Sequence, residues 1–279
     1  MDALAVTGAT GHVGRLVAAH LADLRPRLVL RDPSRAPQLE GATVAQASYD
    51  DLEASRAALA GIDVLFMVSA AESRTRRDEH RTFIRAAADA GVRHIVYTSF
   101  AGAAPDATFT LGRDHFDAEQ AIRESGLTHT FLRDNFYLDV LPLFADEEGT
   151  IRGPAGDGRV AAVARADVAD VAAVVLRNPV DHAGATYELT GPEALTFAEA
   201  AERASAVLGR PMRFEDETVE DAYAWRRAAY GAEDWQLDAW VSTYTAVASG
   251  QVAEVTDDVH RVTGRDPRSL EDVLRQRSR

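Results

Sequence analysis

The sequence predicts an α/β fold class: a Rossmann-type doubly wound parallel sheet with a smaller, mainly helical C-terminal substrate domain. Three observations predict this. Short apolar runs alternate with helix-like segments over the first half of the chain. These runs lack the alternating polarity of a sheet with one solvated face, so a parallel sheet covered on both faces is expected. The segment VTGATGHVG, Val6–Gly14, places three glycines at intervals of three directly after the first run.

The glycine segment predicts a dinucleotide-binding turn, although glycines in a loop of no special role are the alternative. It lies between an expected strand, Ala3–Thr7, and apolar residues that recur at helical spacing. We expect Gly8 to allow a sharp turn, Gly11 to let the main chain approach a pyrophosphate, and Gly14 to let the helix lie close to the strand. The phosphate would then meet N–H groups at the helix N-terminus.

The alternation continues through the first half of the chain. Further strands are expected at Arg27–Leu30, Thr43–Ala47, Ile62–Val68, His94–Ser99, Thr128–Leu132 and Thr186–Thr190. Helices are expected at Asp51–Ala60, Thr75–Ala90 and Arg113–Glu124, each followed by a glycine stop signal. The second of these helices carries RRDEHR, which we expect on its exposed side.

The pattern changes after Arg133. A strand-like segment at Arg159–Ala164 precedes RADVADVAAVVL, in which Asp167 is the expected helix N-cap and Asp170 follows three residues on. From Pro192 the chain becomes helical. We therefore predict an NADP-binding domain made of residues 1–134 plus about 158–190, and a substrate region made of residues 135–157 plus 191–279.

Composition excludes several classes of function. The 279 residues carry a net charge of −14, with 44 acidic and 30 basic side chains, which disfavours a nucleic-acid-binding surface. The chain has neither lysine nor cysteine, so Schiff-base lysines, disulfides and thiolate chemistry are absent. Its eight histidines show no metal-ligand spacing, and we expect no metal. No apolar run approaches a membrane span and no signal-peptide pattern is seen, so we expect a cytoplasmic protein that does not contact membranes.

The end of the second strand indicates which dinucleotide binds. Strands of this fold that select NAD end in an acidic residue that binds the ribose. Here the strand ends in Arg31, which is suited to pair with a 2′-phosphate, and Ser34 and Arg35 are near enough to assist. The alternative is a solvent-exposed arginine beside Asp32. We predict NADP(H).

Other cofactor contacts are expected where strands end, because ligands of open α/β sheets bind at the carboxyl edge. Tyr49 and Asp50 follow the third strand, near the expected adenine, and Ser69 and Ala70 follow the fourth. Thr98 and Ser99 are at the end of the fifth, near the expected nicotinamide.

A second group of residues is expected around the substrate that accepts a hydride from the cofactor. Phe100, Asn135, Phe136 and Tyr137 are the expected acceptor contacts, with packing at the domain junction as the alternative for the last three. The candidate catalytic groups are His115, Ser99 and Tyr137. His115 is a potential proton donor, and its alternative is a surface histidine beside Asp114 and Asp117.

The helix around His115 lacks a familiar acid–base pair. Short-chain dehydrogenases use a Tyr as general acid and a Lys four residues later that lowers its pKa. Phe116 and Gln120 occupy these positions here, and no lysine exists to replace the missing one. Hydride transfer is still expected, since the cofactor carries that chemistry, but toward an acceptor that needs no strong acid, such as a quinone.

Six segments resemble one family: VTGATGHVG, RDPSRA, YTSF, FLRDNFY, GPAGDGRVAAVARADVADVA and VTGRDPRSLEDVL. They are similar to NmrA-like atypical short-chain dehydrogenases, and most like the NADPH-dependent quinone oxidoreductase branch. The resemblance implies NADP(H) in the cleft and an acceptor between two domains. It carries cofactor contacts over to these positions: Gly8, Thr10, Gly11, His12, Val13, Arg31 and Ser69. Where close relatives carry Lys on the helix near the nicotinamide, this chain has Gln120.

Two functions remain open at this point. The first is an NADPH-dependent oxidoreductase acting on a small quinone-like or similarly conjugated acceptor, with a homodimer as the oligomeric state to test. The second is a non-catalytic NADP(H) redox sensor with a protein partner, since NmrA-like relatives include such regulators. The missing Tyr–Lys pair favours the sensor. The aromatic-flanked junction and the resemblance to reductases favour the enzyme, although fold alone does not fix function.

Overall fold

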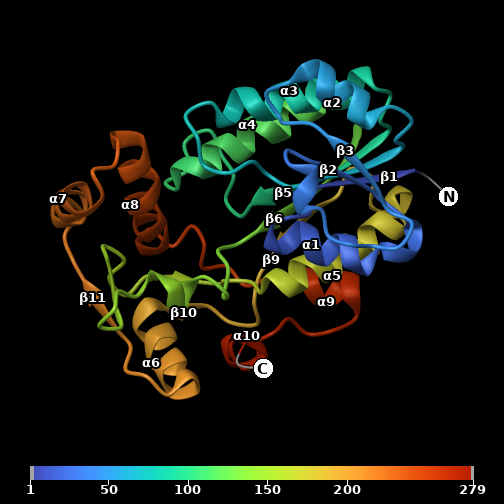
Figure 1. Ribbon diagram of the computed structural model, residues 1–279. Coiled ribbons are helices and arrows are strands. Elements are labelled where there is room, and N and C mark those ends of the chain that lie inside the picture. The colour runs from blue at the N-terminus through green and yellow to red at the C-terminus, as the bar shows by residue number, and fades with distance from the viewer. Residues whose placement is uncertain (1–2, 278–279) are drawn as a thin grey trace. The chain divides into compact units, whose positions relative to one another are not determined.

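The computed structural model describes residues 3–277, and its main feature is a seven-stranded sheet in the order β3-β2-β1-β4-β5-β6-β9 (Figure 1). The strands are β1 Leu4–Thr7, β2 Arg27–Leu30, β3 Thr43–Gln46, β4 Val64–Met67, β5 His94–Phe100, β6 Thr128–Asp134 and β9 Thr186–Leu189. Neighbouring strands from β3 to β5 pair in parallel. The order reverses between β1 and β4, which is the switch point where ligands of such sheets bind. The predicted Rossmann-type sheet is confirmed.

Helices cover both faces of this sheet. They are α1 His12–His20, α2 Leu52–Leu59, α3 Arg76–Asp89, α4 Thr110–Glu124 and α5 Arg165–Arg177. Figure 1 shows α2, α3 and α4 on one face and α1 and α5 on the other. All residues of β1 and β4 are buried, and side chains such as Leu65, Phe83 and Tyr97 form one continuous core. Double coverage explains why these strands are apolar throughout.

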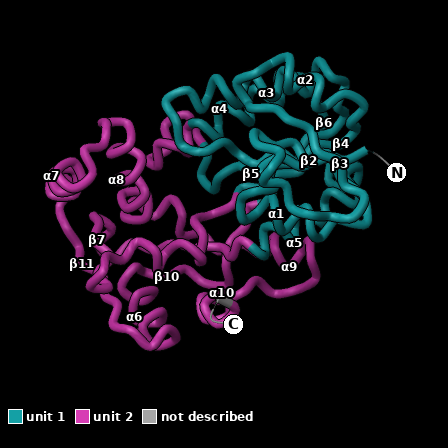
Figure 2. The backbone as a smooth tube through the Cα atoms, in the orientation of Figure 1, with its two compact units in different colours: residues 1–103, 114–133, 166–187 teal, residues 104–113, 134–165, 188–279 magenta. Residues whose placement is uncertain are grey.

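The chain divides into two compact units (Figure 2). Unit 1 comprises Met1–Ala103, Asp114–Arg133 and Ala166–Tyr187, and unit 2 comprises Ala104–Arg113, Asp134–Arg165 and Glu188–Arg279. The sequence-based division instead assigned residues 104–113 and 158–165 to the first domain. Unit 2 is mainly helical, as predicted, with α6 Phe197–Leu208, α7 Val219–Tyr230, α8 Asp234–Ala248, α9 Asp258–Thr263 and α10 Leu270–Arg277. Its short strands are β7 Thr150–Gly153, β8 Arg159–Val160, β10 Leu195–Thr196 and β11 Arg213–Asp216.

Two sequence predictions around α5 are wrong. The strand expected over Arg159–Ala164 is only two residues long, because the following backbone groups bond to separate segments: Ala161 N–H to Val252 O and Val163 N–H to Phe136 O. The helix begins at Arg165, so Asp167 lies inside its first turn instead of at the N-cap. The first N–H of α5 is bonded by the carboxylate of Asp139, a residue distant in sequence.

The prediction for RRDEHR on α3 is also wrong in part. Arg76 and His80 are buried, with exposed fractions of 3% and 0%. They lie at the i and i+4 positions of a stripe that continues through Phe83, Ile84 and Ala87. The remaining charged residues of the segment are not buried.

Candidate cofactor and acceptor site

The turn between β1 and α1 has the backbone geometry that its glycines predict. Gly8 has φ +64°, and a Cβ added there would lie 2.9 Å from the Val68 Cβ. A Cβ on Gly14 would lie 2.4 Å from the Gly8 carbonyl oxygen, so only glycine lets α1 pack this closely on β1. A Cβ on Gly11 would meet only the Gly8 oxygen, at 3.3 Å. The predictions of a sharp turn at Gly8 and of close packing at Gly14 are confirmed.

The N-terminus of α1 is open to an anion. Its N-cap, Gly11, offers no side-chain acceptor, and no acidic residue lies in the first turn. Thr10, Gly11 and His12 are exposed, whereas Val13 is buried. Uncapped N–H groups and the positive end of the helix dipole together favour a phosphate group here.

The segment after β2 combines two arginines with a locally paired carboxylate. Asp32 accepts hydrogen bonds from the backbone N–H and the hydroxyl of Ser34, and these bonds lower its pKa. The hydroxyl proton of Ser34 is therefore engaged by Asp32. Arg31 and Arg35 are exposed, and within residues 3–277 neither side chain makes a hydrogen bond or an ion pair. Two guanidinium groups thus remain available beside the end of β2.

Tyr49 and Asp50 are fixed by neighbours. The Tyr49 hydroxyl lies 2.7 Å from Thr7 Oγ1 and donates to the Val68 carbonyl, and the ring stacks on Phe83 with centroids 4.2 Å apart. Asp50 accepts a hydrogen bond from the Ser48 hydroxyl. Tyr49 therefore joins the segment after β3 to β1 and β4, and its ring packs into the core.

The ends of β4 and β5 are brought together as the sequence predicts. The Ser69 N–H donates to Thr98 Oγ1 over 2.8 Å. The next residue, Ala70, is held at both of its backbone groups by side chains of α3. Its N–H donates to His80 Nε2 over 2.8 Å, and its carbonyl oxygen accepts from Arg76 Nε over 2.9 Å. Two buried side chains therefore fix the backbone that follows β4.

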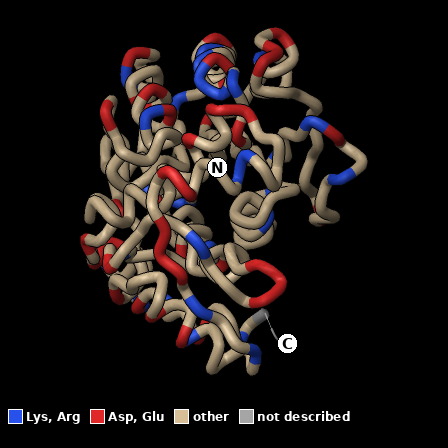
Figure 3. Tube along the Cα trace, turned by 90° about the vertical axis from the view of Figure 1, so that its left-hand side faces the viewer, with Lys and Arg blue, Asp and Glu red and all other residues tan. Residues whose placement is uncertain are grey.

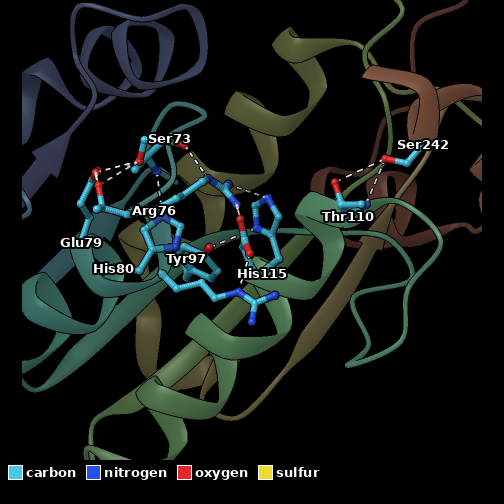
Figure 4. A network of polar contacts seen from close by, with 12 residues as sticks. Ser73, Arg76, Glu79, His80, Tyr97, Thr110, His115 and Ser242 are labelled. Carbon is cyan, nitrogen blue, oxygen red and sulfur yellow. Dashed lines mark hydrogen bonds and ion pairs between the residues drawn. The ribbon is translucent and has the colours of Figure 1, made fainter. Parts of the chain in front are cut away.

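His115 belongs to the same buried network (Figure 4). Arg76 Nη2 lies 3.0 Å from His115 Nε2, and because a guanidinium only donates, Nε2 is the acceptor. The ring proton is then on Nδ1, which lies 3.1 Å from the Tyr97 hydroxyl. Burial, and the charge of Arg76, hold the pKa of His115 well below its ordinary value. His115 is a buried, neutral imidazole, which contradicts the alternative of a surface histidine.

Ser99 is bonded to a buried carboxylate. Its hydroxyl donates to Glu119 Oε1 over 2.6 Å, and Arg133 donates to both oxygens of Glu119, over 2.7 and 2.8 Å. Burial alone would raise the pKa of Glu119, but the hydrogen bonds from Arg133 and Ser99 outweigh it and hold the pKa below its ordinary value. The Phe100 ring lies 6.1 Å from the His115 ring.

The residues after β6 are ordered by contacts within unit 2. Asn135 is buried and donates from Nδ2 to the Val252 carbonyl, while its Oδ1 accepts from the Phe136 N–H. The Phe136 ring packs edge-on against Phe109, 5.1 Å away. The three residues thus combine backbone support with an aromatic surface.

Tyr137 is paired with a buried carboxyl group. Its hydroxyl donates to Asp134 Oδ2 over 2.5 Å, and the Arg165 guanidinium lies 4.9 Å from its ring centroid. The other oxygen of Asp134 is buried without a hydrogen-bond partner among the described residues. Burial, partly offset by the Tyr137 hydrogen bond, raises the pKa of Asp134 to about 7.

Four buried polar residues were missed by the sequence reasoning: Arg76, His80, Glu119 and Asp134. A signal existed for Arg76 and His80, since both continue the apolar stripe of α3.

Within residues 3–277, no group of three or more His, Asp or Glu side chains is placed to hold a metal ion. In the same part of the chain, no helix combines the length and apolar character needed to cross a membrane. Acidic positions are distributed along the whole trace (Figure 3).

The chain is similar to known proteins of one family. A family model described as NAD(P)H-binding matches residues 8–179, and the chain belongs to this family. A (4-alkanoyl-5-oxo-2,5-dihydrofuran-3-yl)methyl phosphate reductase of Streptomyces griseus is 38% identical, over 96% of this chain and 95% of its own. An NAD(P)H azoreductase of Xenophilus azovorans is 34% identical, over 95% and 94%.

Structural similarity and a further relative agree with this. The NADPH complex of the Escherichia coli NADPH-dependent quinone oxidoreductase QOR2 superposes with a TM-score of 0.89 at 30% identity, covering 99% of this chain and 100% of that one. An NmrA-like family domain-containing oxidoreductase of Aspergillus flavus is 26% identical, over 97% of this chain and 93% of its own. The resemblance to NmrA-like, quinone-oxidoreductase-type proteins is confirmed. The protein is an NAD(P)H-dependent reductase, and the prediction of an enzyme is confirmed.

Proposed function

We propose that this protein is an NADPH-dependent reductase that transfers a hydride to a quinone or similarly conjugated acceptor without a Tyr–Lys acid–base pair. The observation that carries this proposal is the pair Phe116 and Gln120 on α4, in a chain that contains no lysine. The similar proteins support it: their names specify a butenolide phosphate, an azo compound and a quinone as acceptors. All three are conjugated, so the electron pair of the hydride is delocalised as it arrives.

The cofactor residues are proposed from the turn and the strand ends. Gly8, Gly11, Gly14 and the uncapped start of α1, with Thr10, His12 and Val13, would hold the pyrophosphate. Arg31, assisted by Arg35 and Ser34, would bind the 2′-phosphate that distinguishes NADP(H) from NAD(H). The segments at Tyr49–Asp50, Ser69–Ala70 and Thr98–Ser99 would border the remaining cofactor.

The chain's own residues position the reactants and supply little acid. Bound NADPH supplies the hydride. Arg76 and His80 hold the Ser69–Ala70 backbone, while His115 is neutral and Ser99 donates to the ionised Glu119. A quinone tolerates this environment because its reduced oxygen is stabilised by the ring and is protonated from water. An isolated ketone would need a proton delivered as its alkoxide forms.

The acceptor contacts are proposed to come from Phe100, Asn135, Phe136 and Tyr137. Phe136 and Tyr137 offer aromatic rings that are only partly buried, suited to stack on a flat conjugated ring. The Asn135 amide is used by backbone groups, so its contribution would be to hold Phe136. Tyr137 and Ser99 remain candidate proton donors, each tied to a carboxyl group.

Turnover by the wild-type protein tests this proposal. We expect NADPH oxidation with a benzoquinone to be at least about 100-fold faster than with unactivated ketones, as lost general acid catalysis costs roughly that factor. Absorbance loss of NADPH would be followed at equal acceptor concentrations. Faster turnover of ketones, or no turnover of any conjugated acceptor by NADPH-saturated protein, would contradict the proposal.

A further inference from the structure

Unit 2 contains a pocket of about 300 Å³ that the proposed function does not yet use. Its lining comes from the start of α4 and the residues just before it, and from α7 and α8, and it includes the polar residues Thr108, Thr110, Arg113, Tyr223, Asp238 and Ser242. We propose that this pocket binds an oxyanion substituent of the acceptor, a carboxylate or a phosphate monoester, through Arg113. This inference rests on the proposed reductase function and names the kind of acceptor that the site prefers.

The Arg113 cation in this pocket has hydrogen-bond donors that are not used within the protein. Arg113 Nε donates to the Ala107 carbonyl over 2.9 Å, which fixes the side chain. Within residues 3–277 its Nη1 and Nη2 atoms make no hydrogen bond, and Arg113 forms no ion pair. A guanidinium held at Nε still presents donors suited to carboxylate or phosphate oxygens. Arg76 on α3 and Arg133 on β6 are instead bonded to carboxylates.

Hydroxyl donors lie in the same pocket lining as Arg113. The Thr108 N–H is bonded to Gln251, but its hydroxyl makes no hydrogen bond among the described residues. Thr110 Oγ1 lies 3.4 Å from the Ser242 hydroxyl oxygen (Figure 4), whose one proton has a closer acceptor in the Ala239 carbonyl, at 3.0 Å. Among the described residues the Thr110 hydroxyl donates no hydrogen bond, so its proton can be donated to a ligand. The first turn of α4 contains no acidic residue, so the positive helix end adds to the preference for an anion.

The helix that carries Arg113 also carries the residues at the positions of the acid–base pair. Arg113, Phe116 and Gln120 lie at positions i, i+3 and i+7 of α4 and therefore share one face of that helix. Phe116 and Gln120 stand where the resemblance places the acid–base pair of short-chain dehydrogenases. Arg113 is thus one turn before the position that faces the reacting carbonyl in that family, which suits recognition of a substituent on the acceptor.

Asp238 also lines the pocket, and its negative charge weakens the preference for an anionic ligand. Asp238 accepts a hydrogen bond from the Tyr223 hydroxyl, over 2.8 Å, and is not paired with Arg113. Its charge opposes an anion, so neutralising it is expected to strengthen the preference that removal of Arg113 weakens. Opposite effects of two substitutions in one pocket would distinguish electrostatic recognition from a general loss of structure.

The experiment uses two pairs of quinone acceptors for the NADPH-loaded protein. The first is a naphthoquinone carboxylate and its methyl ester, and the second is a naphthoquinone phosphate monoester and its parent alcohol. The quantity measured is the ratio of kcat/KM for the anionic compound to that for its neutral partner. We expect Arg113→Gln to lower this ratio roughly 10- to 100-fold, as for a lost charged hydrogen bond. Thr108→Val should lower it a few-fold, about the effect of one neutral hydrogen bond, and Asp238→Asn should raise it.

The matched control is Arg210→Gln, which removes the same charge from an exposed position in unit 2 and should leave the ratio unchanged. An unchanged ratio in both Arg113→Gln and Thr108→Val overturns the inference, even if all quinones are reduced well. If neither member of a pair is turned over, the proposed function fails instead. Calorimetric titration of the NADP⁺-loaded protein with the carboxylate then decides: weaker binding by Arg113→Gln supports the pocket, and equal binding overturns it.

Discussion

At the carboxyl ends of β4 and β5 in unit 1, polar side chains are bonded mainly to one another. Thr98 receives the Ser69 N–H, Arg76 reaches both Ala70 and His115, and Glu119 is shared by Ser99 and Arg133. The pocket of unit 2 differs, because Arg113 and Thr108 keep donors without partners among the described residues.

The difference corresponds to two tasks. A site for a fixed cofactor benefits from a rigid backbone whose supporting groups are already satisfied, so that little reorganisation occurs on binding. A charged substituent, whether of the acceptor or the 2′-phosphate proposed at Arg31, instead needs open donors, and those donors gain their partner only from the ligand. Substitutions in each unit would show whether the two regions have these separate roles.

The largest effect is expected at the glycine turn of unit 1. In Gly11→Asp, a carboxylate would stand where we propose the pyrophosphate to lie, and such like-charge contacts cost several kcal/mol. NADPH affinity should fall at least about 100-fold, which is roughly 2.7 kcal/mol. Calorimetric titration measures this, and thermal unfolding should show a stability near that of the wild type, since a Cβ at Gly11 meets only one atom at 3.3 Å.

Gly14→Ala provides the contrast for this test. Its Cβ would lie 2.4 Å from the Gly8 oxygen, so the substitution should destabilise the fold itself by about 3 kcal/mol, the upper range for overpacking. Retention of wild-type NADPH binding by Gly11→Asp would refute the phosphate role of the turn.

The second effect concerns Asp134, a buried carboxyl group in unit 2 with one unsatisfied oxygen. Its folded-state pKa of about 7 lies above the ordinary value of 3.8, so between these values the folded protein holds a proton that the unfolded chain has lost. Stability is therefore present at low pH and falls as the pH rises through this window. Asp134→Asn removes that loss.

Urea unfolding at several pH values tests the sign of this effect. Relative to Asp134→Asn, the wild type should lose on the order of 2 kcal/mol between about pH 5 and about pH 8, by the energy equivalent of a pKa shift. Tyr137→Phe removes the hydrogen bond that lowers the pKa of Asp134, so its loss of stability should extend to higher pH than that of the wild type. Parallel stability curves for wild type and Asp134→Asn would show that burial of this carboxyl group has no such consequence.

The smallest effect is expected at Arg31, which is exposed to solvent. Arg31→Ala should weaken NADPH binding about tenfold, or roughly 1.5 kcal/mol, as for one charged hydrogen bond at a surface. NADH affinity should change little, because NADH lacks the 2′-phosphate. Titration of both cofactors measures the selectivity, and Arg85→Ala, at an exposed position of α3, controls for net charge. An unchanged ratio of the two affinities would remove Arg31 from the cofactor site.

The sequence by itself determined the Rossmann-type sheet and its binding turn. The strand Arg27–Leu30 was placed to the residue, because its buried apolar run Leu28–Leu30 lies between two proline-containing polar segments. The roles of Gly8 and Gly14 were also readable, since a left-handed turn and close helix packing depend on local backbone sterics alone.

Only the tertiary structure decided how the charged residues are used. The sequence predicts that Arg76 and His80 belong to an exposed charged segment, yet both are buried. They are buried because Asp114, His115 and the Ala70 backbone supply hydrogen-bond partners from other elements. The start of α5 was misplaced for the same reason, since Asp139 bonds its first N–H from a distance in sequence. A charged side chain is buried or exposed according to its partners, and partners distant in sequence are brought together only by the fold.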